Sequence, residues 1–134
     1  MKKILFSLLF LLVSPLFSQS EYKTYNIQTQ FLSTSKMIMN HTTNKWDFIL
    51  NDDFRQFETV WTFYVNNTNN GTITNGSVNY DILGYSQIDE TTIKFEVYNL
   101  KVERKMDLLV IKNDEKLSLA IFDYVQRTSY YFLQ

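Results

Sequence analysis

The side chains that could act as acids, bases or nucleophiles are few in this chain. His41 is the only histidine among the 134 residues, and there is no cysteine. His41 beside a carboxylate such as Asp47 would supply the general-base half of a catalytic pair. No serine lies in a Gly-x-Ser-x-Gly segment to act as its nucleophile, and a catalytic zinc ion usually takes more than one His or Cys ligand. We therefore interpret His41 as a surface residue beside a turn.

Asp52 and Asp53 are the residues that would hold a hard cation if one bound. Together with Asn51 and Glu58 they offer the oxygen ligands that Ca²⁺ prefers. Their spacing lacks the alternating Asp-x-Asp-x-Asp-Gly pattern of a calcium loop, and acidic residues also suit the first turn of a helix without any metal. The sequence therefore predicts no metal site and no cofactor.

Carboxylates elsewhere leave one enzymatic alternative open. A glycosidase needs two carboxyl groups facing each other across a cleft, about 5 to 9.5 Å apart. Spacing in the sequence cannot place any pair at that separation. A small carboxylate-dependent hydrolase or carbohydrate-active enzyme is thus an alternative, and its candidate residues are Asp81, Glu96, Glu103, Asp107 and Asp123.

Aromatic side chains are the remaining candidates for a binding site. Exposed rings on a β-sheet could stack on sugars or on a protein partner, and inward rings could line a cavity for an apolar ligand. The alternative is that they fill the core of a domain without disulfides. Four tyrosines lie opposite the main apolar stripe of their segments, and with the two tryptophans they form the predicted ligand-binding set: Tyr64, Tyr85, Tyr98, Tyr131, Trp46 and Trp61.

The N-terminus has the pattern of a secretory signal peptide. Lys2 and Lys3 precede an apolar run over residues 4–13, Ser14-Pro15 ends this run, and small residues follow at Ser18 and Ser20. The run is shorter than the roughly 20 residues that cross a bilayer. We expect a signal peptide over residues 1–18, cleaved after Ser18 or Ser20. The mature chain would be exported to a periplasm or the cell exterior, with no membrane span after cleavage.

The remaining segment, residues 19–134, has the size of one domain. Its 116 residues carry 11 basic and 14 acidic side chains, a net charge of −3, which argues against a nucleic-acid surface. Without cysteine it has no disulfides, so its 19 aromatic residues must contribute much of the core. Frequent Lys and Asn with scarce Gly and Pro are typical of proteins from AT-rich bacterial genomes.

Alternation of apolar and polar residues predicts β-strands along this whole domain. In residues 58–66, Trp61 and Phe63 point to one face and Thr62 and Tyr64 to the other. Asn75-Gly76 predicts a tight hairpin, and Gly84 inside a strand predicts a bulge. Residues 51–57 are expected to form a one-turn helix or compact loop, and residues 33–35 a turn. The other expected strands cover 22–31, 36–41, 46–50, 78–88, 93–97, 106–112, 117–125 and 129–134.

These segments predict an all-β domain built as a single antiparallel β-barrel or β-sandwich. About eight to ten short strands, joined by turns every eight to twelve residues, indicate a meander of hairpins. The expected architecture is similar to that of small exported barrels such as lipocalin-type binders, although no lipocalin signature motif is present. Fold alone does not imply function.

The sequence therefore favours an exported, non-enzymatic binding or interaction module. Its partner would be a small apolar ligand, a glycan or a protein. The enzyme described above is one alternative. The other is a structural accessory subunit of a cell-envelope complex that docks through a sheet edge or an aromatic face.

Overall fold

The computed structural model describes residues 22–48, 54–66 and 70–134. These residues contain nine β-strands and no helix. The predicted signal peptide and the candidate metal ligands Asp52 and Asp53 lie outside the described residues. The strands are β1 (Tyr22–Asn40), β2 (Lys45–Phe48), β3 (Arg55–Asn66), β4 (Gly71–Thr74), β5 (Asn79–Asp89), β6 (Thr92–Asn99), β7 (Arg104–Asn113), β8 (Lys116–Asp123) and β9 (Thr128–Leu133).

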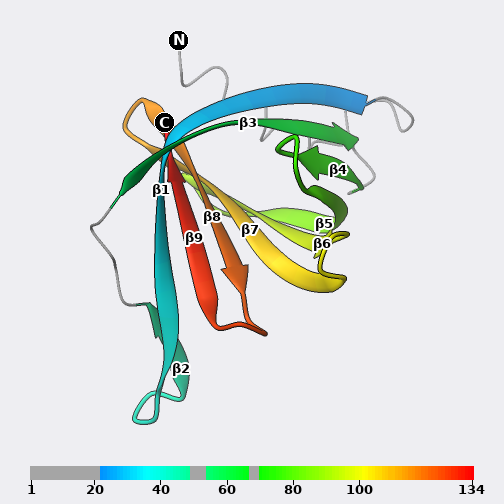
Figure 1. Ribbon diagram of the computed structural model, residues 1–134. Coiled ribbons are helices and arrows are strands. Elements are labelled where there is room, and N and C mark those ends of the chain that lie inside the picture. The colour runs from blue at the N-terminus through cyan, green and yellow to red at the C-terminus, as the bar shows by residue number, and fades with distance from the viewer. Residues whose placement is uncertain (1–21, 49–53, 67–69) are drawn as a thin grey trace.

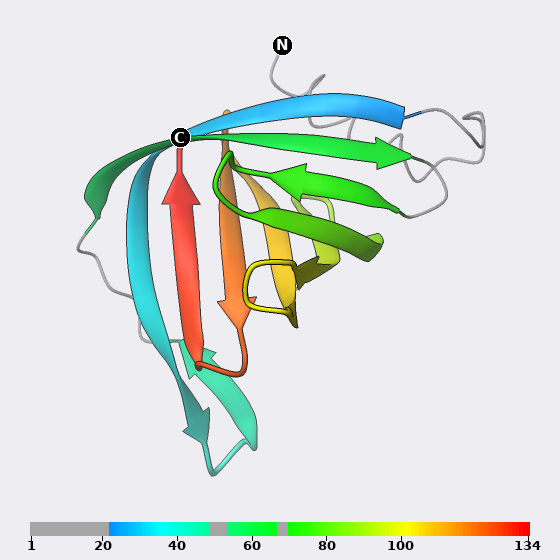
Figure 2. The same cartoon turned by 45° about the vertical axis from the view of Figure 1, so that its right-hand side comes forward.

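Eight of these strands close into an antiparallel β-barrel. Sequential neighbours from β3 to β9 pair with one another, and β1 pairs with both β3 and β9. Strand β2 pairs with the last residues of β1 and forms a hairpin that projects from the barrel (Figures 1 and 2). The expected all-β class is confirmed, and of the two expected architectures the structure is the barrel.

Strand β1 closes the barrel because it changes neighbours along its length. Residues 22–32 pair with β3, and residues 31–36 pair with β9. The change coincides with a register shift between Thr29 and Phe31. The predicted turn at residues 33–35 is therefore wrong. Ser33 and Ser35 pair with Tyr131 and Ser129, so the strand continues because β9 supplies backbone partners.

Residues 51–57 were expected to form a one-turn helix or compact loop, and this expectation is wrong for residues 55–57. Residues 55–57 belong to β3, where Arg55 pairs with Leu32 and Gln56 with Phe31. Pairing with β1 satisfies the backbone groups that a single helical turn would leave open. Two other expectations are confirmed. Gly84 lies at a register shift between β5 and β6, and Asn75-Gly76 lies in the turn between β4 and β5.

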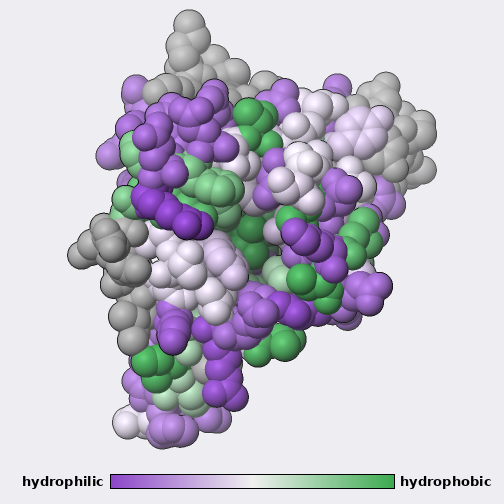
Figure 3. All heavy atoms as spheres, in the orientation of Figure 1, coloured by the Kyte–Doolittle hydropathy of each residue, from purple (hydrophilic) through white to green (hydrophobic). Residues whose placement is uncertain are grey.

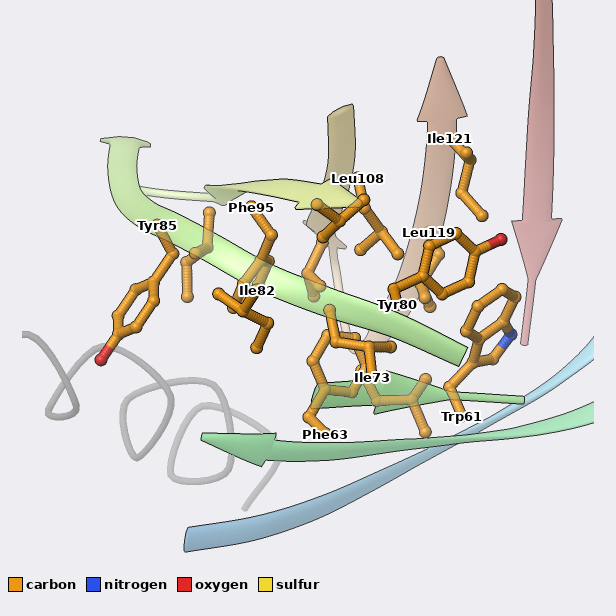
Figure 4. Close-up of a cluster of buried hydrophobic side chains, with 14 of the residues drawn as sticks. Trp61, Phe63, Ile73, Tyr80, Ile82, Tyr85, Phe95, Leu108, Leu119 and Ile121 are labelled. Carbon is orange, nitrogen blue, oxygen red and sulfur yellow. The ribbon is translucent and has the colours of Figure 1, made fainter. Parts of the chain in front are cut away.

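The barrel interior is filled by alternate side chains of the strands. Trp61, Phe63 and Val65 on β3 are completely buried, as are Leu108 and Val110 on β7. Aromatic rings meet across the interior, with 5.4 Å between the ring centroids of Phe63 and Phe95 and the same distance between Tyr85 and Phe95 (Figure 4). This core holds the strands of the domain together without a disulfide.

The two ends of the barrel differ. Antiparallel pairing puts the turns β4–β5, β6–β7 and β8–β9 at one end, which we call the mouth. The turns β5–β6 and β7–β8 and the end of β9 lie at the opposite end (Figure 1). There the Tyr85 hydroxyl donates a hydrogen bond to the backbone carbonyl of Asn66, 2.7 Å away, so the buried phenol is satisfied.

Candidate functional site

A pocket of about 290 Å³ opens at the mouth of the barrel, and we call it the mouth pocket. Strands β1 and β3, the five strands from β5 to β9, and the mouth turns all contribute to it. Hydrophobic side chains show at the centre of the face seen in Figure 3, with hydrophilic side chains around them. The lining residues are Leu32, Arg55, Phe57, Trp61, Asn75, Tyr80, Asn99, Val102, Arg104, Met106, Ile121, Asp123, Gln126, Tyr130 and Phe132.

Aromatic rings form one wall of the mouth pocket. Trp61 packs edge-on against Phe132 with 4.9 Å between ring centroids, and Phe132 lies 6.4 Å from Phe57. The indole Nε1 of Trp61 donates to the hydroxyl of Thr29 at 3.2 Å. Because this bond satisfies the one polar atom of the indole, the wall presents apolar surface to the pocket.

An ion pair between a partly exposed arginine and a buried carboxylate lies at the base of two mouth turns. Arg104 begins β7 and Asp123 ends β8, and the guanidinium meets the carboxylate with 3.0 Å from Nε to Oδ1 and 2.6 Å from Nη2 to Oδ2. The Asp123 side chain is only 2% exposed. Burial alone would raise its pKa. Hydrogen bonds from Arg104 and from the backbone of Gln126 and Val125 outweigh burial and hold the pKa of Asp123 below its ordinary value.

Tyr80 places a phenol deep in the pocket. The residue is 5% exposed, its ring lies 6.4 Å from Trp61, and its hydroxyl points toward β9 (Figure 4). Burial raises the pKa of Tyr80 to about 12, and the nearby Tyr130 and Asp123 add to the shift. Unlike Tyr85, Tyr80 makes no hydrogen bond through its hydroxyl to any group in the described part of the chain.

Arg55 supplies a second cation at the rim of the pocket. Its guanidinium carbon lies 5.8 Å from the centroid of the Phe57 ring, and its side chain is exposed. No salt bridge to Arg55 occurs within the described residues. The pocket thus combines apolar walls, a neutralised ion pair inside and one solvated positive charge at its entrance.

The structure does not bring the sequence-predicted ligand-binding tyrosines together. Tyr64 on β3 and Tyr131 on β9 line separate depressions on the outer wall, of about 460 and 560 Å³. Tyr98 is half-buried on the outer face of β6. Tyr85 was expected on the outside but is buried in the core, because the bulge at Gly84 reverses which residues of β5 point inward.

The larger outer depression is a poorer candidate than the mouth pocket. It adjoins the β7–β8 turn, and Asp114, Glu115 and Lys116 of this turn are part of its lining with Tyr131. These charged side chains are exposed, so water already solvates them well. The mouth pocket is smaller, but the aromatic rings of Trp61, Phe132 and Phe57 form one of its walls, and its one carboxylate is paired with Arg104.

The two tryptophans predicted as ligand-binding residues, Trp46 and Trp61, lie in different parts of the structure. Trp61 was predicted as a candidate ligand-binding residue, and it does line the mouth pocket, although it is completely buried and cannot act as an exposed stacking platform. Trp46 belongs to β2, where its backbone pairs with Met39. The orientation of the Trp46 side chain lies outside what the structure describes.

The remaining candidates for chemistry do not form a catalytic set in the described residues. His41 is exposed in the turn between β1 and β2, as expected. No cluster of three or more His, Cys, Asp or Glu side chains occurs in the described ranges. The mouth pocket has a single carboxylate among its lining residues, Asp123. Within the same ranges, no helix is long and apolar enough to cross a bilayer.

Tyr80, Arg104 and Tyr130 were not predicted as site residues, and Asp123 was considered only as one of several carboxylates. A signal for them exists in the sequence. Asp123 continues the inward series of Leu119 and Ile121 in β8, and Arg104 begins the inward series that continues with Met106 in β7. Two opposite charges at inward positions of successive strands indicate a buried pair.

No protein-family model, no curated protein and no solved structure matches this chain.

Proposed function

We propose that this chain is an exported, non-enzymatic binding protein that takes a small, largely apolar molecule into the mouth pocket. The observation that carries the proposal is an open pocket of about 290 Å³ with an aromatic wall, which lies at one end of a barrel with a core of buried hydrophobic side chains. Ligand pockets span roughly 300 to 1,000 Å³ and are lined mostly by apolar side chains with a few polar groups. The signal-like N-terminus supports export to a periplasm or the cell exterior.

The arrangement of carboxylates in the mouth pocket gives little support to the enzymatic alternative. Carboxylate-dependent glycoside hydrolysis needs an acid with a raised pKa and a second carboxylate across the cleft. Asp123 has a lowered pKa, and both of its oxygens already accept hydrogen bonds from Arg104. A residue held in this way stabilises the pocket but has no proton to donate near neutral pH.

The alternative of an accessory subunit has one observation in its favour. Strand β2 pairs only with β1 among the described strands, so its other edge could accept a strand from a partner chain. The mass of the native protein in envelope extracts would test this alternative, because a docked subunit would migrate with its complex.

The binding proposal can be tested with an apolar fluorescent dye, N-phenylnaphthylamine. Val102 lines the pocket from the β6–β7 turn and is partly exposed, so Val102→Trp should fill the entrance without disturbing a strand. We expect the wild-type protein to bind the dye saturably. We expect Val102→Trp to weaken binding about tenfold or more, which corresponds to roughly 1.4 kcal/mol.

Leu100→Trp is the matched control. Leu100 lies two residues away in the same turn and is exposed, but it does not line the pocket. This variant should bind the dye like the wild type. Absence of saturable binding by the wild type, or equal weakening in both variants, would show that the mouth pocket is not a binding site.

A further inference from the structure

The unsatisfied hydroxyl of Tyr80 indicates what the polar end of a ligand should be. A phenol this deeply buried usually has a hydrogen-bond partner, because leaving a buried donor unpaired costs free energy. Tyr85 follows this rule at the other end of the barrel by donating to Asn66. Tyr80 makes no such bond within the described residues, and it lines an open pocket.

Two further side chains of the mouth pocket, Arg104 and Asn99, also have N–H donors to spare. Arg104 uses Nε and Nη2 on Asp123, and its Nη1 makes no hydrogen bond in the described part of the chain. The side-chain amide nitrogen of Asn99 contacts only the sulfur of Met106, at 3.8 Å.

The carboxylate of Asp123, by contrast, is already occupied as an acceptor. Asp123 accepts from Arg104 and from the backbone N–H groups of Val125 and Gln126. The one carboxylate of the pocket is therefore already occupied and makes no hydrogen bond to the Tyr80 hydroxyl in the described part of the chain.

The charge balance inside the pocket favours a neutral acceptor over a carboxylate. The positive charge of Arg104 is cancelled by Asp123, so a second carboxylate beside it would be desolvated without a counter-ion. The uncancelled cation, Arg55, is exposed at the rim and away from the buried phenol. A neutral carbonyl oxygen can accept from Tyr80 without bringing an uncompensated charge into the pocket.

We propose that the mouth pocket binds a neutral apolar molecule with a carbonyl oxygen, which accepts a hydrogen bond from the buried Tyr80 hydroxyl while the apolar part lies against Trp61, Phe132 and Ile121. Arg104 offers a second donor through Nη1. This inference rests on the proposed function, since it names the ligand class of the same pocket.

The test compares three ligands with similar chains: decane, methyl octyl ketone and decanoate. Each would compete with N-phenylnaphthylamine for the wild-type protein and for Tyr80→Phe. We expect the ketone to bind the wild type more tightly than decane and decanoate do. Tyr80→Phe should weaken ketone binding about tenfold and leave decane binding unchanged, because a net hydrogen bond of this kind accounts for about a factor of ten.

An infrared measurement reports the contact directly. The carbonyl stretch of the bound ketone should shift to lower frequency in the wild type, as a hydrogen-bonded carbonyl does, and the shift should disappear in Tyr80→Phe. The variant should fold, since it loses a hydroxyl that has no protein partner. Tyr98→Phe, which removes a hydroxyl from the outer face of β6, should bind the ketone like the wild type.

The outcomes separate this inference from the proposed function. If neither the dye nor decane binds, the proposed function is wrong. If decane binds but the ketone gains nothing from the Tyr80 hydroxyl, the pocket takes apolar ligands and the carbonyl inference is wrong. A decanoate that binds more tightly than the ketone and is indifferent to Tyr80 would also overturn the inference, as would a Tyr80 hydroxyl that bonds only to an ordered water.

Discussion

At the scale of single residues, Asp123 and Tyr80 lie in one pocket but have opposite protonation states. Burial and neighbouring groups keep Asp123 ionised and Tyr80 protonated. Asp123 stays ionised because Arg104 and two backbone N–H groups hold its negative charge. Tyr80 stays neutral because burial and nearby negative charge oppose its ionisation. The mouth pocket is therefore held by a permanent ion pair and keeps its phenol protonated as a donor over the whole physiological pH range.

The alkaline stability of the protein should depend on Tyr80. Its pKa is raised from 10.0 to about 12 in the folded protein, so the folded state keeps a proton that the unfolded chain loses. The stability that this group contributes is present below pH 10 and is lost as the pH rises from about 10 to 12. Two units correspond to about 2 to 3 kcal/mol. Urea unfolding across this range should show a smaller loss for Tyr80→Phe than for the wild type.

Tyr25, Tyr85 and Tyr124 also have pKa values raised by burial. These three tyrosines are present in both the wild type and Tyr80→Phe. The difference between the two plots of stability against pH therefore reports the ionisation of Tyr80 alone. Parallel curves for the wild type and Tyr80→Phe would mean that the Tyr80 hydroxyl ionises in the folded protein as easily as in the unfolded chain.

At the scale of elements, the short strand β4 depends on a glycine. Gly71 has φ of +142°, and a Cβ added there would collide with the backbone carbonyl oxygen of Tyr64 on β3. Gly71→Ala would force either the backbone or β3 to move, and we expect it to cost at least about 2 kcal/mol of stability. Thermal and urea unfolding would measure the cost.

Gly84 is the matched control for this prediction. It also lies in a strand, at the bulge of β5, but a Cβ there would meet no atom within 4 Å and its φ is not positive. Gly84→Ala should change stability by less than about 1 kcal/mol, with the lower entropy of the unfolded chain acting in its favour. Similar losses in both variants would show that the close approach of β3 and β4 is not what requires Gly71.

Elements with local signals could be predicted from the sequence, and those fixed by distant partners could not. The turn at Asn75-Gly76 and the bulge at Gly84 were predicted because their residues favour those conformations in any context. The turn at Ser33–Ser35 was predicted wrongly from the same kind of reasoning. Small hydroxyl residues are common in turns, but here β9, almost 100 residues away, pairs with them and keeps β1 extended.

At the scale of the whole molecule, closure of the barrel makes its strands interdependent. Phe132 on β9 packs against Trp61 on β3, across the strand β1 that joins them. Phe132→Ala should cost about 3 to 5 kcal/mol, typical of a buried phenylalanine. Because the sheet has no free edge within the barrel, we expect amide hydrogen exchange to accelerate together in β5, β6 and β7 as well as in β9.

Phe122→Ala tests the same prediction from the outer wall. Phe122 is partly exposed and its ring lies 6.5 Å from Tyr124, outside the core. Its removal should cost less and leave the exchange of β5 to β7 nearly unchanged. If Phe132→Ala accelerates exchange in β9 alone, the strands do not unfold as one unit.

The sequence could not distinguish the barrel from a sandwich for a physical reason. Both use the same alternation and the same hairpins, and they differ in whether the first and last strands meet. That contact joins residues such as Phe31 and Leu133, and no local pattern in either strand specifies it. The mouth pocket depends on the same closure, because its walls come from strands on both sides of this seam.

The separation between the mouth and the end of β9 has a practical consequence for measuring affinity. The last residue, Gln134, lies at the opposite end of the barrel, where its side chain accepts a hydrogen bond from the backbone of Leu117. A tether attached after Gln134 would therefore hold the barrel on a sensor chip or a bead with its opening toward the flowing solution.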